Sequence, residues 1–220
     1  LMMLPEMFTT GFSMNPEQFA ETSNGKALQQ MKKWAAKKNA AVCGSMMFND
    51  LGKYYNRLVW MLPDGNFFQY DKKHLFSLGD ENNHYTSGKS QLVVPYKGWD
   101  VKLLICYDLR FPVWCRNKKD FDLLIFVANW PEKRTYAWKQ LLIARAIENQ
   151  CYVAAVNRVG TDKNEVYHCG ESMLIDPKGE VMESVLHQEK IITSKISYAY
   201  LQQIRNDFPF LKDADAFSIQ

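Results

Sequence analysis

The chain has 220 residues, of which 47% are hydrophobic and 23% charged, which excludes a disordered or fibrous protein. Its 27 basic and 24 acidic side chains leave a net charge of +3, too small to predict a nucleic-acid partner. The length fits one domain, which we expect to span residues 1–220. No apolar run is long enough to predict a membrane-spanning helix, so we expect no membrane partner.

The first part of the chain predicts one strand, one long helix and a set of further strands. We expect a short strand over residues 1–4 and a helix over 16–39, where apolar residues recur at helical spacing. Lys32, Lys33, Lys37 and Lys38 lie off that apolar stripe and indicate a solvated helix face. Further strands are predicted at 41–48, 54–62 and 66–70, and the last two flank the turn Pro63-Asp64-Gly65.

The second part of the chain alternates in the same way. Residues 76–89 are predicted to form a polar loop, 91–94 and 100–106 strands, and 110–118 a helix. The apolar run 122–128 is typical of a strand covered on both faces, and it precedes the clearest helix, 136–150, and a strand over 151–156. We expect a hairpin of strands 172–176 and 181–186, a strand over 190–195 and a helix over 199–206. The fold class is therefore α/β, and the pattern leaves open one doubly wound sheet or a sandwich of two sheets.

Three reactive side chains stand at the ends of predicted strands. Glu6 follows the first strand, Lys72 follows the strand 66–70, and Cys106 ends the strand 100–106. A cysteine at a strand-to-helix turn is exposed at the edge of a sheet, close to the backbone N–H groups that begin the helix. Taken singly, each residue has a plainer interpretation, because free cysteines are mostly buried structural residues and loop charges are mostly solvated.

Together these segments resemble the nitrilase, or carbon–nitrogen hydrolase, superfamily. The segments that match are Leu4-Pro5-Glu6, Tyr70-Asp71-Lys72-Lys73-His74-Leu75 and Cys106-Tyr107-Asp108-Leu109-Arg110-Phe111-Pro112, in the order that the family shows. A second family glutamate, in a Glu-x6-Gly loop, matches Glu81 with Gly88. Four separated motifs in order are far more specific than one short motif.

The resemblance narrows to bacterial omega-amidases of the YafV type. It rests on four further segments: Val127-Ala128-Asn129-Trp130-Pro131, Ala144-Arg145-Ala146-Ile147-Glu148-Asn149-Gln150, Asn157-Arg158-Val159-Gly160 and Arg205-Asn206-Asp207-Phe208-Pro209. The resemblance implies a four-layer αββα sandwich and a homodimer or higher homo-oligomer. It also implies a strand and a helix before Leu4-Pro5-Glu6, so we expect the sequence to be incomplete at its N-terminus.

The implied reaction is hydrolysis of a terminal carboxamide to a carboxylic acid and ammonia through a cysteine thioester. The expected nucleophile is Cys106, and Glu6 is expected to carry the proton. We expect the Lys72 ammonium to stabilise the oxyanion and Glu81 to position Lys72, Glu6 or water. The chemistry needs a nucleophile, a proton carrier and a cation, so we expect no metal and no organic cofactor.

The substrate implied by the resemblance is a small molecule, the omega-amide of a dicarboxylate such as 2-oxoglutaramate. The Tyr107 N–H is expected to bind the oxyanion and Trp130 to form a pocket wall. Candidates for the distal carboxylate are Arg134, Lys133, Lys73 and Arg110, and we expect Arg110 to pair with Asp108 instead.

Other functions remain possible on the sequence alone. Within the superfamily they are a nitrilase, an N-carbamoyl amidohydrolase or an aliphatic amidase. Outside it, they are a non-catalytic oligomeric binding module, which four intact site residues disfavour, and a nucleic-acid binder that uses the 32–38 lysines, which the small net charge disfavours. The five cysteines form no CxxC pair and there is no Asn-x-Ser/Thr sequon, which favours free thiols in the cytoplasm.

Overall fold

Two β sheets lie face to face between helices in the computed structural model, which describes residues 1–118 and 120–219. The smaller sheet has the order β1 (Met2–Met3), β2 (Val42–Asp50), β3 (Lys53–Met61), β4 (Phe67–Asp71). The larger has the order β11 (Val181–Leu186), β10 (Tyr167–Ile175), β8 (Tyr152–Asn157), β7 (Leu123–Ala128), β6 (Trp99–Ile105), β5 (Val93–Tyr96), and β9 (Val159–Thr161) pairs with β10. The arrangement selects the two-sheet sandwich from the alternatives left open by the sequence.

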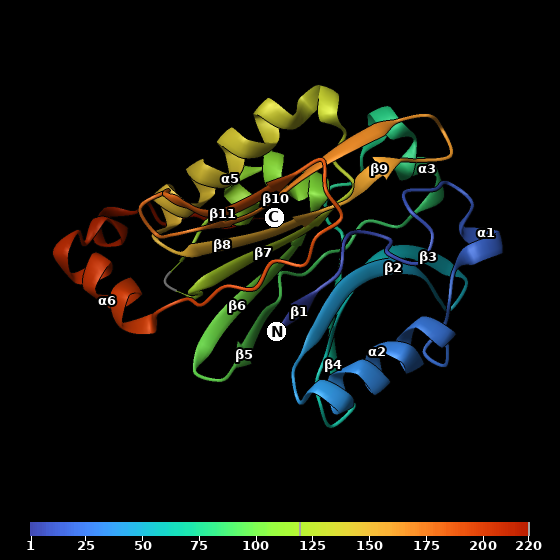
Figure 1. The fold of residues 1–220 in the computed structure, drawn as a ribbon, viewed down its shortest axis with the longest axis horizontal. Helices are drawn as coiled ribbons and strands as arrows, with labels where there is room; N and C mark the ends of the chain where they lie inside the picture. The colour runs from blue at the N-terminus through green and yellow to red at the C-terminus, as the bar shows by residue number, and fades with distance from the viewer. Residues whose placement is uncertain (119, 220) are drawn as a thin grey trace.

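Helices cover the outer faces of both sheets, which gives the layer order α–β–β–α (Figure 1). Helix α2 (Lys26–Lys38) lies on the smaller sheet and α5 (Thr135–Asn149) on the larger. The other helices are α1 (Pro16–Phe19), α3 (Glu81–His84), α4 (Pro112–Cys115) and α6 (Tyr198–Asp207), with 3-10 turns η1 (Ser77–Gly79), η2 (Cys106–Arg110), η3 (Glu132–Arg134) and η4 (Phe210–Asp213). Within the described ranges, no helix has the length and apolar character needed to cross a membrane.

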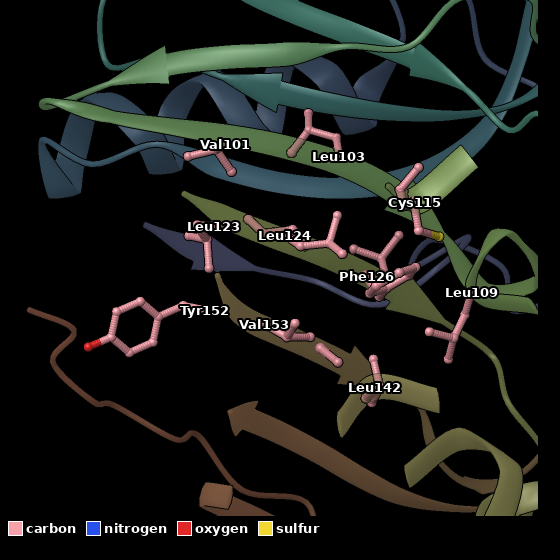
Figure 2. Close-up of a cluster of buried hydrophobic side chains, with 14 of the residues drawn as sticks. Val101, Leu103, Leu109, Cys115, Leu123, Leu124, Phe126, Leu142, Tyr152 and Val153 are labelled. Atoms are coloured by element: carbon pink, nitrogen blue, oxygen red, sulfur yellow. The ribbon is translucent and has the colours of Figure 1, made fainter. Parts of the chain in front are cut away.

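Strand alternation produces two separate apolar layers. In β3, Leu58 and Trp60 belong to the largest apolar cluster. The same cluster holds Phe126 of β7 and Leu142 of α5, which Figure 2 labels. Val59 and Met61 point the other way and pack with α2. As predicted, β7 is buried along its whole length because it is covered on both faces.

The helix predicted over 16–39 is wrong in its continuity. It divides into α1 and α2, because Glu21 between them leaves the helical path and bonds to β2. The Glu21 carboxylate also accepts the N–H of Ala27 at 2.8 Å and so caps α2. Lys32, Lys33, Lys37 and Lys38 of α2 are exposed, as expected of a solvated face.

Two other predictions fail for a related reason. Residues 190–195 form no strand, because they pair with no described strand. Strand propensity alone does not stabilise a strand without a partner. The helix predicted over 110–118 is reduced to α4, because the Asn117 amide turns the chain back toward Phe121 and Asn149. The loop predicted over 76–89 contains η1 and α3, and β10 begins at Tyr167, earlier than expected.

Candidate active site

The fold brings Glu6, Lys72, Glu81 and Cys106 to one place at the ends of strands from both sheets. The Lys72 ammonium lies 2.9 Å from Oε1 of Glu6 and 2.8 Å from Oε2 of Glu81. These three side chains are buried, and Cys106 is partly buried beside them. Residues that are up to 100 positions apart in the chain thus form one ionic cluster next to a thiol.

Glu6 is fixed by the packing of the segment before it on β2 and by hydrogen bonds from Asn129. β1 approaches β2 closely at Gly44, where a Cβ would lie 2.8 Å from the Cβ of Leu4. Asn129, directly after β7, donates its backbone N–H to Oε2 of Glu6 at 2.8 Å and its side-chain amide to the Glu6 carbonyl at 2.7 Å. The carboxylate therefore has one defined orientation.

Lys72 is held at the end of β4 by contacts with its neighbours in space. Its N–H donates to the carbonyl of Asn56 on β3 at 3.0 Å, and its carbonyl accepts from Gly88 at 2.9 Å. A Cβ on Gly88 would lie 2.0 Å from the Asp71 carbonyl oxygen, so only glycine allows this approach. The spacing of Glu81 and Gly88 thus brings the loop back against the lysine.

Cys106 occupies a strained turn between β6 and η2. Its φ is +43°, in the left-handed region that residues with a Cβ rarely adopt. Asp108 holds the turn: one carboxylate oxygen accepts the Ile105 N–H at 3.0 Å and the Tyr70 hydroxyl at 2.7 Å. Such strain persists where the surroundings determine it, and it is common at reactive sites.

Asn56 is a member of the cluster that the sequence did not reveal. Its side-chain amide donates to Oε1 of Glu6 at 2.8 Å and to Oε1 of Glu81 at 3.0 Å, so it joins the two carboxylates. Asn56 lies inside a largely apolar strand and is fully buried. A polar residue within such a run was the available signal, because buried amides need partners. The role of Asn129 is likewise not predictable from its motif, because it depends on contact with Glu6.

The charges of the cluster favour a neutral thiol in the resting site. Burial, followed by the charge of Glu6, raises the pKa of the Cys106 thiol, and Lys72 opposes this only in part. Burial acts to lower the pKa of Lys72, but the carboxylates of Glu6 and Glu81 outweigh it, so the pKa is raised and the lysine stays charged. Burial also raises the pKa of Glu81, which Lys72 partly offsets. A thiolate would add a second net negative charge to this cluster.

A cavity of about 1500 Å³ opens beside the thiol. Its lining includes the catalytic candidates Glu6, Lys72 and Cys106, the predicted binding residues Tyr107, Trp130 and Arg134, and Phe12 and Phe76. Glu81 lies behind Lys72 and is not part of the lining. Phe76 donates its N–H to Glu81 at 2.6 Å, which links this wall to the ionic cluster.

The cavity also holds several cations. Arg110 lies over the ring of Trp130 at 4.9 Å, and Arg134 lies over Phe76 at 5.2 Å. The expected ion pair of Asp108 with Arg110 is wrong, because Asp108 turns inward to Tyr70, His74 and Ile105 while Arg110 is exposed. Lys73 lies over Trp114 and does not line the cavity, whereas Lys133 and Arg158 do.

Comparison with known proteins shows which family the chain resembles. The sequence profile of the carbon–nitrogen hydrolase family matches residues 1–206. The chain is 42% identical to omega-amidase YafV of Yersinia enterocolitica, over 99% of this chain and 85% of that protein. It is 35% identical to 2-oxoglutaramate amidase of Bacillus subtilis, over 97% of this chain and 84% of that protein.

The structure agrees with these sequence matches. It resembles that of a CN-hydrolase superfamily protein from Xanthomonas campestris with a TM-score of 0.97 and 45% identity, covering 99% of this chain and 85% of that one. That protein carries an arsenic adduct in its active site. From its fold, its family match and these relatives, the chain belongs to the carbon–nitrogen hydrolase family, within the nitrilase superfamily.

Proposed function

We propose that this enzyme hydrolyses the omega-amide of a dicarboxylate, such as 2-oxoglutaramate, to the dicarboxylate and ammonia. The observation that carries the proposal is one cavity that contains a thiol beside a Glu–Lys pair and also Arg110 and Arg134. Neither guanidinium has a carboxylate within ion-pair distance among the described residues. A cavity that holds these two cations together with an amide-cleaving thiol fits a substrate with an amide at one end and a carboxylate at the other.

In the acylation step, the thiol of Cys106 attacks the amide carbon and its proton passes to Glu6. This transfer keeps the net charge of the cluster constant, which matters because burial and Glu6 both disfavour a free thiolate. The oxyanion that forms is stabilised by the Lys72 ammonium and the N–H of Tyr107. Glu6 then protonates the amide nitrogen, the C–N bond breaks, and ammonia leaves a thioester on Cys106.

In the deacylation step, water attacks the thioester carbon and gives a proton to Glu6. The C–S bond breaks, the product acid leaves, and the proton returns to the sulfur. Glu81 holds Lys72 through two contacts of 3.1 and 2.8 Å, and Asn56 joins Glu81 to Glu6. We therefore assign Glu81 to positioning of Lys72 rather than to proton transfer.

The test is ammonia release from 2-oxoglutaramate, an aliphatic nitrile and an N-carbamoyl amino acid, with wild type and Cys106→Ala. We expect the wild type to prefer 2-oxoglutaramate and Cys106→Ala to be inactive. Brisk turnover of the nitrile or carbamoyl compound without turnover of the oxo-amide would contradict the proposal. Intact mass after brief exposure to an electrophile should show one label, absent from Cys106→Ala; a label that persists in that variant excludes Cys106 as nucleophile.

We also propose that the enzyme is a cytoplasmic homodimer or a higher homo-oligomer. All five cysteines are free and four are buried, which fits a reducing compartment. Tyr136 and Ile147 on α5 are 79% and 51% exposed, and a second copy could cover them. Light scattering tests the assembly, and a monomer at micromolar concentration would contradict it.

A further inference from the structure

One short turn forms the part of the cavity wall that carries Trp130 and Arg134. The Trp130 indole N–H donates to the Arg134 carbonyl at 2.8 Å and closes the turn on itself. The side chain of Asn157 accepts the Trp130 N–H at 2.7 Å and donates to the Trp130 carbonyl at 3.0 Å. The beginning of the turn is therefore fixed at Trp130, and its end depends on what holds Arg134 and Thr135.

Arg134 stands on the same wall as the reacting thiol. Its guanidinium lies 5.2 Å from the centre of the Phe76 ring, and Phe76 lies edge-on to Tyr107 at 5.0 Å. Tyr107 directly follows Cys106. The position of Arg134 relative to the amide end of a bound substrate is thus set by how the turn is held, since Arg134 forms no ion pair with a described residue.

Glu171 holds the end of this turn. It is buried, and its carboxylate accepts a short hydrogen bond from the hydroxyl of Thr135, the residue after Arg134. Its carbonyl accepts the indole N–H of Trp138 at 2.8 Å, and Trp138 packs on Trp130 at 5.4 Å between ring centres. Glu171 therefore contacts the first turn of α5 at two residues, Thr135 and Trp138.

The backbone of Glu171 adopts a costly conformation to make these contacts. Its φ is +55°, and it follows Gly170 at +76°, at a bulge where the pairing of β10 with β11 shifts register. A left-handed residue with a Cβ in a strand is unfavourable, and bulges often redirect a side chain beside an active site. Here the bulge directs the carboxylate to Thr135.

We propose that Glu171 is a positioning residue for substrate selection: through Thr135 and Trp138 it fixes the turn that presents Arg134 to the distal carboxylate of the substrate. The inference rests on the proposed function, because it assigns the carboxylate end of the omega-amide to Arg134. Glu171 itself does not line the cavity and touches no reacting atom.

The experiment compares 2-oxoglutaramate with butyramide, a neutral amide of similar length. In Glu171→Ala and in Thr135→Val, KM for 2-oxoglutaramate should rise about tenfold or more, since small displacements of a positioning group cost that much. The kcat for 2-oxoglutaramate and the kcat/KM for butyramide should stay within about twofold. Glu171→Gln retains a carbonyl oxygen that can accept the Thr135 hydroxyl, so it should restore KM.

Asp176→Ala is the matched control, because Asp176 is a second buried carboxylate just after β10 that binds Tyr200, away from the cavity. It should lower the melting temperature without changing the ratio of the two substrates. Equal losses on both substrates in Glu171→Ala, or an unchanged ratio, would overturn the inference while leaving the proposed function intact. A wild type that does not prefer 2-oxoglutaramate to butyramide would overturn both.

Discussion

Asp108 and His74 meet twice at one oxygen atom. Oδ1 of Asp108 accepts the backbone N–H of His74 at 3.0 Å and lies 2.8 Å from Nδ1 of its ring. His74 comes two residues after Lys72, and Asp108 comes two residues after Cys106. One carboxylate therefore ties the segment that carries Lys72 to the turn that carries Cys106.

Asp108→Asn should reduce kcat by about 100-fold, because one oxygen of the carboxylate becomes an amide that cannot accept its donors and the turn relaxes. Steady-state kinetics at fixed pH measure this loss. The melting temperature should also fall, so Asp176→Asn, with a similar loss of stability, serves as the control and should keep its kcat. If kcat in Asp108→Asn equals that of the wild type, the link is not needed for catalysis.

The proposed mechanism gives Lys72 a catalytic role besides its structural one, and a double variant can separate the two. Lys72→Met should lower kcat by at least about 100-fold, since loss of one oxyanion donor costs about 2.7–4 kcal/mol. It should also destabilise the fold by about 3–5 kcal/mol, because Glu6 and Glu81 are left buried without their cation. Adding Glu81→Leu should recover part of the stability, measured by urea unfolding, and none of the activity. Recovery of activity would show that the cation is not part of the chemistry.

The thiol of Cys106 should titrate at unusually high pH. Burial and the charge of Glu6 raise its pKa, so the wild-type thiolate should form only above the ordinary thiol range. In Glu6→Gln the neighbouring negative charge is gone and Lys72 remains, so the thiolate should appear at lower pH although turnover is lost. Ultraviolet absorbance against pH, with Cys106→Ser subtracted, measures both curves. A thiolate already present at neutral pH in the wild type would rule out Glu6 as the base.

The sequence could predict those parts of the fold and site that carry their own local pattern. The apolar run of β7 and the helical pattern of α5 are internal to each segment, and the structure confirms both predictions. Glu6, Lys72 and Cys106 each follow or end a predicted strand, a place where side chains of different strands meet, and the structure brings the three together. Their catalytic roles come from the family resemblance and stay predictions. The Glu81 assignment rested on its spacing from Gly88, which the approach of Gly88 to Asp71 explains.

The sequence could not predict features that depend on a distant partner. Residues 190–195 have strand-like composition but pair with no described strand. Asn56 and Asn129 gain their roles only when the two sheets bring them to Glu6. The sequence pairs Asp108 with its neighbour Arg110, whereas two of its donors, His74 and Tyr70, lie 34 and 38 positions away.

Lys102 gives a prediction about stability that is independent of catalysis. It is fully buried in β6, where its ammonium donates to Gln91 at 3.1 Å and lies over the Phe121 ring at 5.1 Å. Burial lowers its pKa below the ordinary 10.5, so the charged form is less favourable in the folded than in the unfolded protein.

Lys102→Met keeps the length of the side chain and removes the buried charge, so it should raise the free energy of unfolding by about 1 kcal/mol at neutral pH. In the wild type, the unfolded state binds more protons between the lowered pKa and 10.5, so stability should increase with pH across that window. The gain from Lys102→Met should therefore shrink as pH rises toward 10.5, measured as the difference in melting temperature. The exposed Lys178→Met is the control and should show no such trend. A stability difference that is constant with pH would mean that Lys102 has the same pKa in the folded and the unfolded state. A loss of stability in Lys102→Met at neutral pH would mean that the contacts of Lys102 with Gln91 and Phe121 outweigh the burial of its charge.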